Sequence, residues 1–195
     1  MSDHIRVAVI GIGHMGSAHA CCISSGKIVG MTLTAVCDVR PERLSWAEQE
    51  LPSVLRFSDY HELLASGAAD AAIIAVPHPL HCRIAVDALH AGLHVLSEKP
   101  LGIRLSDARE AVDVGREAGK IFAVMLNQRT NPIFRKAREI VSGGRLGELK
   151  RSVWIITNWY RTQHYYDSGD WRASWRGEGG GVLLNQAPHN LDLWQ

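Results

Sequence analysis

The stretch that most constrains this chain is an apolar run followed by closely spaced glycines, Val7-Ala-Val-Ile-Gly11-Ile-Gly13-His-Met-Gly16. Helix-compatible residues follow it. In the spacing G-x-G-x-x-G, the first glycine permits a tight turn after a strand. The second lets the backbone approach a pyrophosphate, and the third lets the new helix pack against the strand. The first N–H groups of a helix lack partners within it, and the helix dipole is positive there, so the stretch predicts a phosphate site.

A second element supports this interpretation, because glycine clusters also mark ordinary turns. The segment from Thr32 ends in Asp38, which lies 22 residues after Gly16. A carboxylate about 20 residues after the last glycine is expected to bind the ribose hydroxyls of a dinucleotide. Asp38 as a cap of the next helix is the alternative. Arg40 could pair with a 2′-phosphate, which leaves NADP open beside NAD, or it could simply face solvent. The residues expected at the dinucleotide are therefore Gly11, Ile12, Gly13, His14, Met15, Gly16, Asp38 and Arg40.

Strand and helix patterns alternate through residues 1–125. The predicted strands are Ile5–Ile10, Met31–Cys37, Val54–Phe57, Ala71–Val76, His94–Ser97 and Ile121–Leu126. The predicted helices are His14–Ser25, Pro41–Leu51, Tyr60–Ala65, Leu80–Ala91 and Asp107–Ala118, with Asp59 and Ser106 as N-caps of the third and fifth. Such alternation predicts an α/β fold, a doubly wound parallel sheet of the Rossmann type.

The pattern changes in residues 126–195. A helix is predicted for Pro132–Ser142, a strand for Leu149–Trp159, and a helix from Val182 that still runs at Gln195. One strand cannot form a stable sheet. We therefore expect these residues to be the incomplete start of an α+β domain whose open sheet needs more chain.

Composition narrows the classes of function. A net charge of +1 over 195 residues gives no general attraction to nucleic acid or to anionic membranes. No apolar run approaches the roughly 18 residues of a membrane helix, and the four cysteines form no C-x-x-C pair. We therefore expect a cytoplasmic protein that binds neither nucleic acid nor a membrane. His78 and His81 have metal-ligand spacing, but no further ligand set accompanies them, so no metal is expected.

The chain resembles the glucose–fructose oxidoreductase / inositol dehydrogenase / MocA family (Gfo/Idh/MocA). The resemblance covers essentially the whole chain. It rests on the glycine stretch above and on three further motifs, Ala75-Val-Pro-His-Pro-Leu-His81, Ala91-Gly-Leu-His-Val-Leu-Ser-Glu-Lys-Pro100 and Gly179-Gly-Gly-Val-Leu-Leu-Asn-Gln-Ala-Pro-His189-Asn-Leu-Asp192. It implies a nicotinamide cofactor, a sugar or polyol substrate, a second domain for substrate and oligomerisation, and a homo-oligomer for a longer parent protein.

The resemblance also implies roles for single residues. Lys99 and His189 would be the catalytic pair, and the Lys99–Pro100 peptide would be cis. Pro77, His81, Glu98 and Lys99 would lie at the cofactor. Lys99, Arg129, Trp171, Arg172, Asn185 and His189 would meet the substrate. Lys99 could otherwise be a surface lysine, Arg129 part of a helix-entry loop, and Trp171, Arg172 and Trp175 the core of the small domain.

One residue departs from the family pattern. Many members carry Asp where this chain has Asn185. An amide binds a hydroxyl group but cannot act as a base, so more of the proton transfer would fall to Lys99 and His189. On a continuous helix Asn185 and His189, four residues apart, would share a face.

The expected function is therefore an NAD(P)-dependent oxidoreductase that moves hydride between nicotinamide and a secondary alcohol of a sugar or cyclitol. One alternative is a hydrolase that recycles a bound NAD internally, and another is a non-catalytic sensor that binds the cofactor. Retention of both Lys99 and His189 argues against the sensor.

Overall fold

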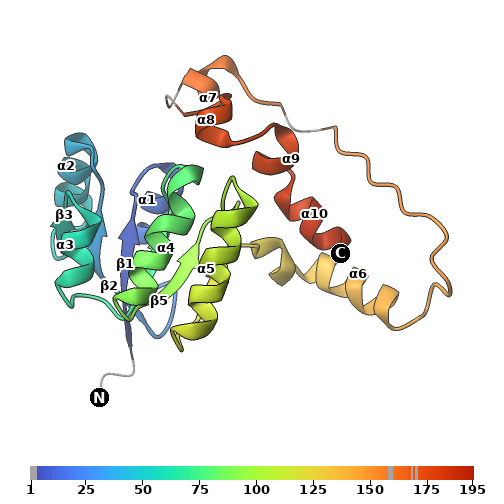
Figure 1. The fold of residues 1–195 in the computed structure, drawn as a ribbon, viewed down its shortest axis with the longest axis horizontal. Helices are drawn as coiled ribbons and strands as arrows, with labels where there is room; N and C mark the ends of the chain where they lie inside the picture. Colours follow the sequence, from blue (N-terminus) through green and yellow to red (C-terminus); the bar gives the residue numbers. More distant parts are fainter. Residues whose placement is uncertain (1–3, 158–159, 168, 170) are drawn as a thin grey trace. The chain divides into compact units, whose positions relative to one another are not determined.

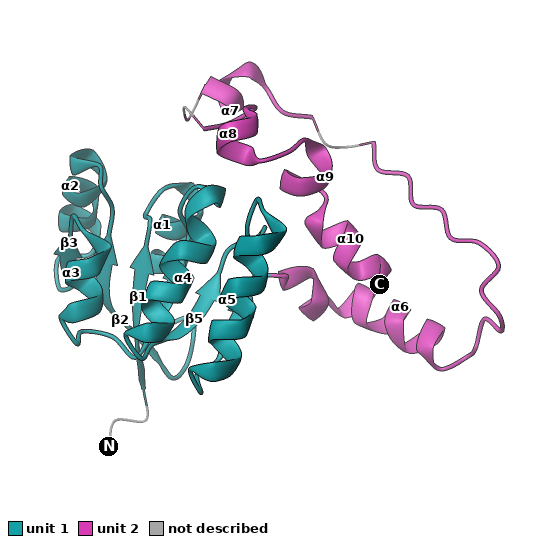
Figure 2. Ribbon diagram, in the orientation of Figure 1, with its two compact units in different colours: residues 1–125 teal, residues 126–195 magenta. Residues whose placement is uncertain are grey.

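The computed structural model describes residues 4–157, 160–167, 169 and 171–195. The chain forms two compact units, residues 1–125 and residues 126–195, coloured separately in Figure 2. Each unit is described by itself below.

Unit 1 is built on one six-stranded sheet, which Figure 1 shows with its flanking helices. The strand order is β3-β2-β1-β4-β5-β6, and neighbouring strands all pair in parallel. The strands are β1 (Ile5–Ile10), β2 (Met31–Cys37), β3 (Leu55–Phe57), β4 (Ala71–Ile74), β5 (His94–Ser97) and β6 (Phe122–Val124). Because the order reverses between β1 and β4, this is the doubly wound sheet expected from the sequence.

Helices cover both faces of this sheet. They are α1 (His14–Ser24), α2 (Pro41–Glu50), α3 (Tyr60–Ala65), α4 (His81–His90) and α5 (Leu105–Glu117), with a 3₁₀ turn η1 (His78–Leu80) before α4. Alternate residues of β1 point to opposite faces, so Val7 and Val9 pack in one buried cluster and Ala8 and Ile10 in the other. The first cluster also holds apolar residues of α1 and α2, and the second those of α3 and α4.

Several predicted boundaries need correction. The helix α5 begins at Leu105 with Arg104 as its N-cap, and the hydroxyl of Ser106 donates to the Asp107 carboxylate instead of capping. The fourth strand ends at Ile74, two residues earlier than predicted. Asp59 does cap α3, accepting the N–H of His61 at 2.8 Å.

Unit 2 is helical wherever it has regular structure in the described residues. Its elements are the 3₁₀ turn η2 (Asn127–Thr130), α6 (Pro132–Ser142), α7 (Gln163–Asp167), α8 (Trp175–Glu178), α9 (Val182–Asn185) and α10 (Pro188–Trp194). The helix α6 has its predicted bounds, and Asn131 caps it through the N–H of Ile133. Within the described ranges of the whole chain, no helix combines the length and hydropathy that a bilayer crossing needs.

Two predictions for unit 2 were wrong. Residues 149–157 form no strand, and 158–159 lie outside the described residues. A strand is stabilised by hydrogen bonds to a neighbour, and the described part of this unit offers no second strand to pair with. The predicted helix from Val182 is broken between α9 and α10, because Pro188 has no N–H to continue it and instead begins a new helix.

Candidate functional site

The predicted cofactor residues of unit 1 belong to loops at one edge of the sheet. All strands are parallel, so the loops that follow β1, β2, β4 and β5 leave from the same, carboxyl edge. Ligands of doubly wound sheets bind at this edge, where the strand order reverses. The glycine loop, Asp38, Pro77 and Lys99 each lie in one of these four loops.

The glycine loop has a separate steric reason for each glycine. Gly11 has a φ of +85°, and a Cβ there would lie 2.6 Å from the carbonyl oxygen of Ala75. A Cβ on Gly16 would lie 1.8 Å from the carbonyl oxygen of Gly11, so α1 packs directly on the loop. At Gly13 the nearest atom to an added Cβ would be a guanidinium nitrogen of Arg40, 3.9 Å away. Gly13 is therefore dispensable for packing, and its lack of a side chain leaves open the space that a pyrophosphate would need.

Asp38 is fixed against this loop. Its side chain is 8% exposed, and one carboxylate oxygen accepts the N–H of Ile12 at 2.9 Å. The other accepts the N–H of Arg40 at 3.0 Å, with Nε of Arg40 3.5 Å away. Arg43 donates from Nε to the carbonyl oxygen of Ile12 at 2.6 Å. The carboxylate is thus held beside the loop with acceptor capacity left for ribose hydroxyls, while His14 and Met15 are exposed in the first turn of α1.

A residue that the sequence analysis missed, His19 of α1, pairs with Glu98. Nε2 of His19 donates to the Glu98 carboxylate at 2.8 Å, and the N–H of Lys99 donates to the same carboxylate at 3.2 Å. Burial acts to raise the pKa of Glu98, but the hydrogen bond and charge of His19, together with Lys99, outweigh it and lower the pKa below its ordinary value. Glu98 therefore links the glycine-loop helix to the Lys99 turn. No local sequence pattern pairs residues 79 positions apart.

This pair predicts a pH effect on stability. A carboxyl group with a lowered pKa in the folded state stabilises the fold above its unfolded pKa, and that contribution is lost as the pH falls through the folded pKa. We expect His19→Ala to reduce stability near neutral pH by about 1 kcal/mol, because a largely buried carboxylate loses a hydrogen bond. We also expect the stability difference from the wild type to shrink as the pH falls through the folded pKa of Glu98, where the contribution of the pair is lost.

Urea unfolding at a series of pH values measures both effects. His14→Ala, at the exposed start of the same helix, is the matched control and should leave the pH profile unchanged. A stability difference between His19→Ala and the wild type that is absent at neutral pH, or unchanged from neutral to acid pH, would contradict the role given to the pair.

The turn after β5 contains Lys99 and Pro100. The Lys99–Pro100 peptide is cis, as the resemblance implied. Lys99 is partly exposed at the sheet edge, and Pro77 is partly buried between β4 and η1. His81 differs from its predicted role, because its ring is buried and both nitrogens contact main-chain oxygens, which leaves neither directed at a cofactor.

The predicted residues of unit 2 are held by partners within that unit. The guanidinium of Arg129 donates twice to the carboxylate of Asp192, one bond being 2.8 Å. These hydrogen bonds lower the pKa of Asp192. The side-chain amide of Asn185 donates to the buried carboxylate of Glu178. His189 lies in the first turn of α10, and because the helix breaks before Pro188, Asn185 and His189 do not share a continuous helix face.

Trp171 and Arg172 belong to an aromatic and cationic cluster. The Arg172 guanidinium carbon lies 4.5 Å from the Trp171 ring centroid and 4.2 Å from that of Tyr165. Arg172 donates to the Tyr165 hydroxyl at 2.7 Å, and Gln186 donates to the same hydroxyl at 3.2 Å. These packed contacts match the alternative in which Trp171 and Arg172 stabilise the small domain. Their predicted contact with substrate stays a prediction.

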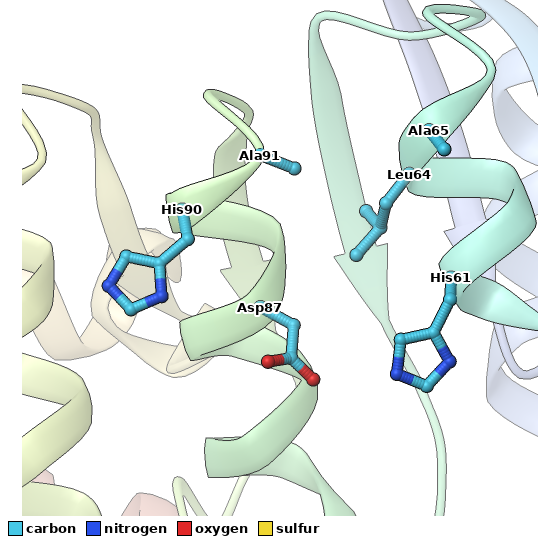
Figure 3. A pocket seen from close by; sticks show the side chains of 6 residues that line it. All are labelled: His61, Leu64, Ala65, Asp87, His90 and Ala91. Carbon is cyan, nitrogen blue, oxygen red and sulfur yellow. The ribbon is translucent and has the colours of Figure 1, made fainter.

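A hollow of about 410 Å³ in unit 1 is separate from these loops. Figure 3 shows its lining, in which Asp87, His90 and Ala91 come from α4 and His61, Leu64 and Ala65 from α3. The last turns of these helices lead into β4 and β5, so the hollow lies toward the amino edge of the sheet. It holds none of the predicted site residues. In the described part of the chain, no group of three His, Cys, Asp or Glu side chains could hold a metal ion.

Comparison with known families agrees with this geometry. The model of an oxidoreductase family with an NAD-binding Rossmann fold, Gfo/Idh/MocA, matches residues 5–126, and its C-terminal domain model matches residues 134–195. The chain belongs to the Gfo/Idh/MocA family.

Relatives within the Gfo/Idh/MocA family include solved structures with bound nicotinamide cofactor. The myo-inositol 2-dehydrogenase of Thermotoga maritima is 28% identical over 97% of this chain and 53% of its own length. The WlbA dehydrogenase of Bordetella pertussis, solved with NADH and UDP-GlcNAcA, is 34% identical with a TM-score of 0.88, over 97% of this chain and 57% of its own. The scyllo-inositol dehydrogenase of Lactobacillus casei, solved with NAD(H) and scyllo-inositol, is 30% identical with a TM-score of 0.70, over 74% and 43%.

The chain spans about half the length of the curated relatives that it matches. The match to the NAD-binding Rossmann fold covers residues 5–126, and with them nearly all of unit 1, so NAD binding by this unit follows from membership in Gfo/Idh/MocA.

Proposed function

We propose that this protein is an NAD-dependent oxidoreductase that transfers hydride between nicotinamide and a secondary alcohol of a sugar or cyclitol. One observation carries the proposal. The open approach at Gly13, the carboxylate of Asp38 and the side chain of Lys99 belong to loops at the same edge of one parallel sheet. The first two fit the diphosphate and ribose of a dinucleotide, and the third supplies a group for proton transfer.

The residues of unit 1 suit NAD in particular. Asp38 accepts hydrogen bonds and would accept those of both adenosine ribose hydroxyls, whereas a 2′-phosphate would meet its negative charge. Arg40, beside Asp38, is already within 3.5 Å of that carboxylate. When bound, the nicotinamide ring accepts or supplies the hydride, and the protein holds the geometry and moves the proton.

Lys99 and His189 carry the proton transfer in this proposal. An imidazole that titrates near neutral pH can take the proton of the substrate hydroxyl, and the lysine ammonium can hydrogen-bond the oxygen as its charge changes. Asn185 cannot share that task, because its amide donates to Glu178 and has no titratable proton. Arg129, Trp171 and Arg172 as substrate contacts, a homo-oligomer and a cytoplasmic location stay predictions.

The sugar or cyclitol class rests on the relatives, which include dehydrogenases of myo-inositol and scyllo-inositol and a dehydrogenase crystallised with UDP-GlcNAcA. The test is a titration with NAD and NADP, followed by a panel of inositols, sugars and a nucleotide-linked uronic acid, read at the absorbance band of reduced nicotinamide. We expect tighter binding of NAD and accumulation of free NADH with at least one alcohol. Product formation without free NADH would favour the internally recycled hydrolase, and failure to bind either dinucleotide would overturn the proposal.

A further inference from the structure

His81 is the first residue of α4. It is 1% exposed, among the most buried polar side chains of the described residues. Its Nδ1 lies 2.6 Å from the carbonyl oxygen of Pro100, and its Nε2 lies 2.7 Å from the carbonyl oxygen of Val76. One ring therefore spans two main-chain oxygens that come from different loops of the sheet edge.

Those two loops flank the proposed site. Val76 lies in the loop that follows β4. A γ-carbon of its side chain lies 2.8 Å from the position that a Cβ on Gly11 would occupy. Pro100 follows Lys99 after β5. The His81 ring thus connects the loop that lies beside Gly11 with the peptide carbonyl next to Lys99.

Carbonyl oxygens only accept hydrogen bonds, so each of these contacts needs an N–H of the ring. A neutral imidazole has one N–H and can serve one carbonyl at a time, whereas a doubly protonated ring serves both. Burial is the main influence on the pKa of His81 and lowers it below its ordinary value, with a smaller contribution from the charge of Lys99. The two carbonyl contacts and the Glu98 carboxylate raise the pKa but do not outweigh burial. The ring of His78 lies against that of His81 at 5.7 Å between centroids. In either protonation state the ring donates to at least one of these carbonyls, and because His81 itself directly follows the loop after β4, a hydrogen bond to the Pro100 oxygen joins the two loops.

We propose that His81 is a positioning residue, whose ring ties the loop after β4 to the Lys99–Pro100 turn and so sets where Lys99 stands at the sheet edge. The expected effect of His81 on catalysis rests on the function proposed above. Its hydrogen bonds are independent of that function. A lysine displaced by about 1 Å from its reacting partner can lose about a hundredfold in rate, whereas diphosphate binding depends on the glycine loop.

The first experiment reads the ring directly, without substrate. In ¹⁵N-histidine-labelled wild-type protein, the Nδ1–H of His81 should exchange slowly with water and show through-hydrogen-bond coupling to the carbonyl carbon of Pro100. His90, exposed at the end of the same helix, is the internal control and should exchange fast. A ring proton of His81 that exchanges as fast as that of His90 would overturn the proposal, whatever the enzyme's substrate.

The second experiment separates positioning from folding. His81→Leu removes both N–H groups, and His81→Gln keeps an amide donor. We expect His81→Leu to lower kcat by about tenfold to a hundredfold with an NAD dissociation constant within about threefold of wild type, and His81→Gln to recover part of kcat. Equal loss of NAD binding and kcat in both variants would mean a general structural role. If His81→Leu does not fold, His81→Gln and the exchange measurement still test the positioning role. A wild-type protein without turnover would refute the proposed function but would leave the hydrogen bonds of His81 unaffected.

Discussion

Gly16→Ala should destabilise unit 1 by about 3 kcal/mol or more and abolish NAD binding. The added Cβ would lie 1.8 Å from the carbonyl oxygen of Gly11 and 2.9 Å from its carbonyl carbon. These are main-chain atoms, so no side-chain rotation relieves the overlap, and α1 or the glycine loop must move. Overpacking a tight site costs about 1–3 kcal/mol when it can relax and more when backbone must shift.

The matched variant is Gly13→Ala in the same loop. Gly13 has φ −65° and ψ −154°, which any residue adopts, and an added Cβ would meet nothing closer than 3.9 Å. Its stability should stay within about 0.5 kcal/mol of wild type. Its NAD affinity should fall by roughly a hundredfold, about 2.8 kcal/mol, because the methyl group occupies the approach of the pyrophosphate.

Thermal unfolding and NADH fluorescence titration of the two variants test the pair of effects. Loss of stability only at Gly16, with loss of affinity at both, is the expected pattern. If Gly13→Ala bound NAD as tightly as wild type, the diphosphate would not approach this loop as we describe. A stable Gly16→Ala would show that α1 and the loop are less tightly packed than the structure indicates.

Lys99→Met should lower turnover by about 10²–10⁴-fold while leaving NAD binding within a few fold of wild type. Proton transfer by a positioned side chain contributes about this much to rate. Methionine keeps the length and apolar stem of lysine and removes only the ammonium group, and Lys99 is partly exposed, so folding should be little affected.

Lys99→Arg separates charge from proton transfer. A guanidinium keeps a positive charge at the sheet edge but does not release its proton in the working range of pH. If the lysine moves a proton, the arginine variant should be nearly as slow as the methionine variant, and the pH–rate profile should lose one ionisation. Steady-state kinetics with the alcohol found in the substrate panel measure both. A methionine variant with wild-type kcat would remove Lys99 from the mechanism.

Local patterns were enough to predict most of unit 1. The bounds of β1, β2, β5 and α3 agree with the structure, because each is a short run of matching period that a glycine or a polar residue ends. The glycine spacing and Asp38 were predicted for the same reason. The glycine spacing depends on residues close in sequence. The position of Asp38 depends on the nearly fixed number of residues between the first strand and the end of the second.

Other features depend on what a segment packs against. The apolar pattern of residues 149–157 is typical of a strand, yet they form none, because a strand needs a neighbour for its backbone hydrogen bonds. The helix predicted from Val182 is interrupted before Pro188. A proline inside a helical pattern predicts such a break, so the sequence alone contained this signal.

The sequence by itself determined the order of the elements, the parallel sheet and the glycine loop, since these follow from periodicity and from the stereochemistry of single residues. Only the tertiary structure decided that His19 binds Glu98, that Arg129 binds Asp192 and that the ring of His81 spans the carbonyls of Val76 and Pro100. The physical reason is that a side-chain hydrogen bond needs its two atoms within about 3 Å. For residues 79, 63 or 19 positions apart, that distance is set by how whole helices and strands pack, and no local pattern records it.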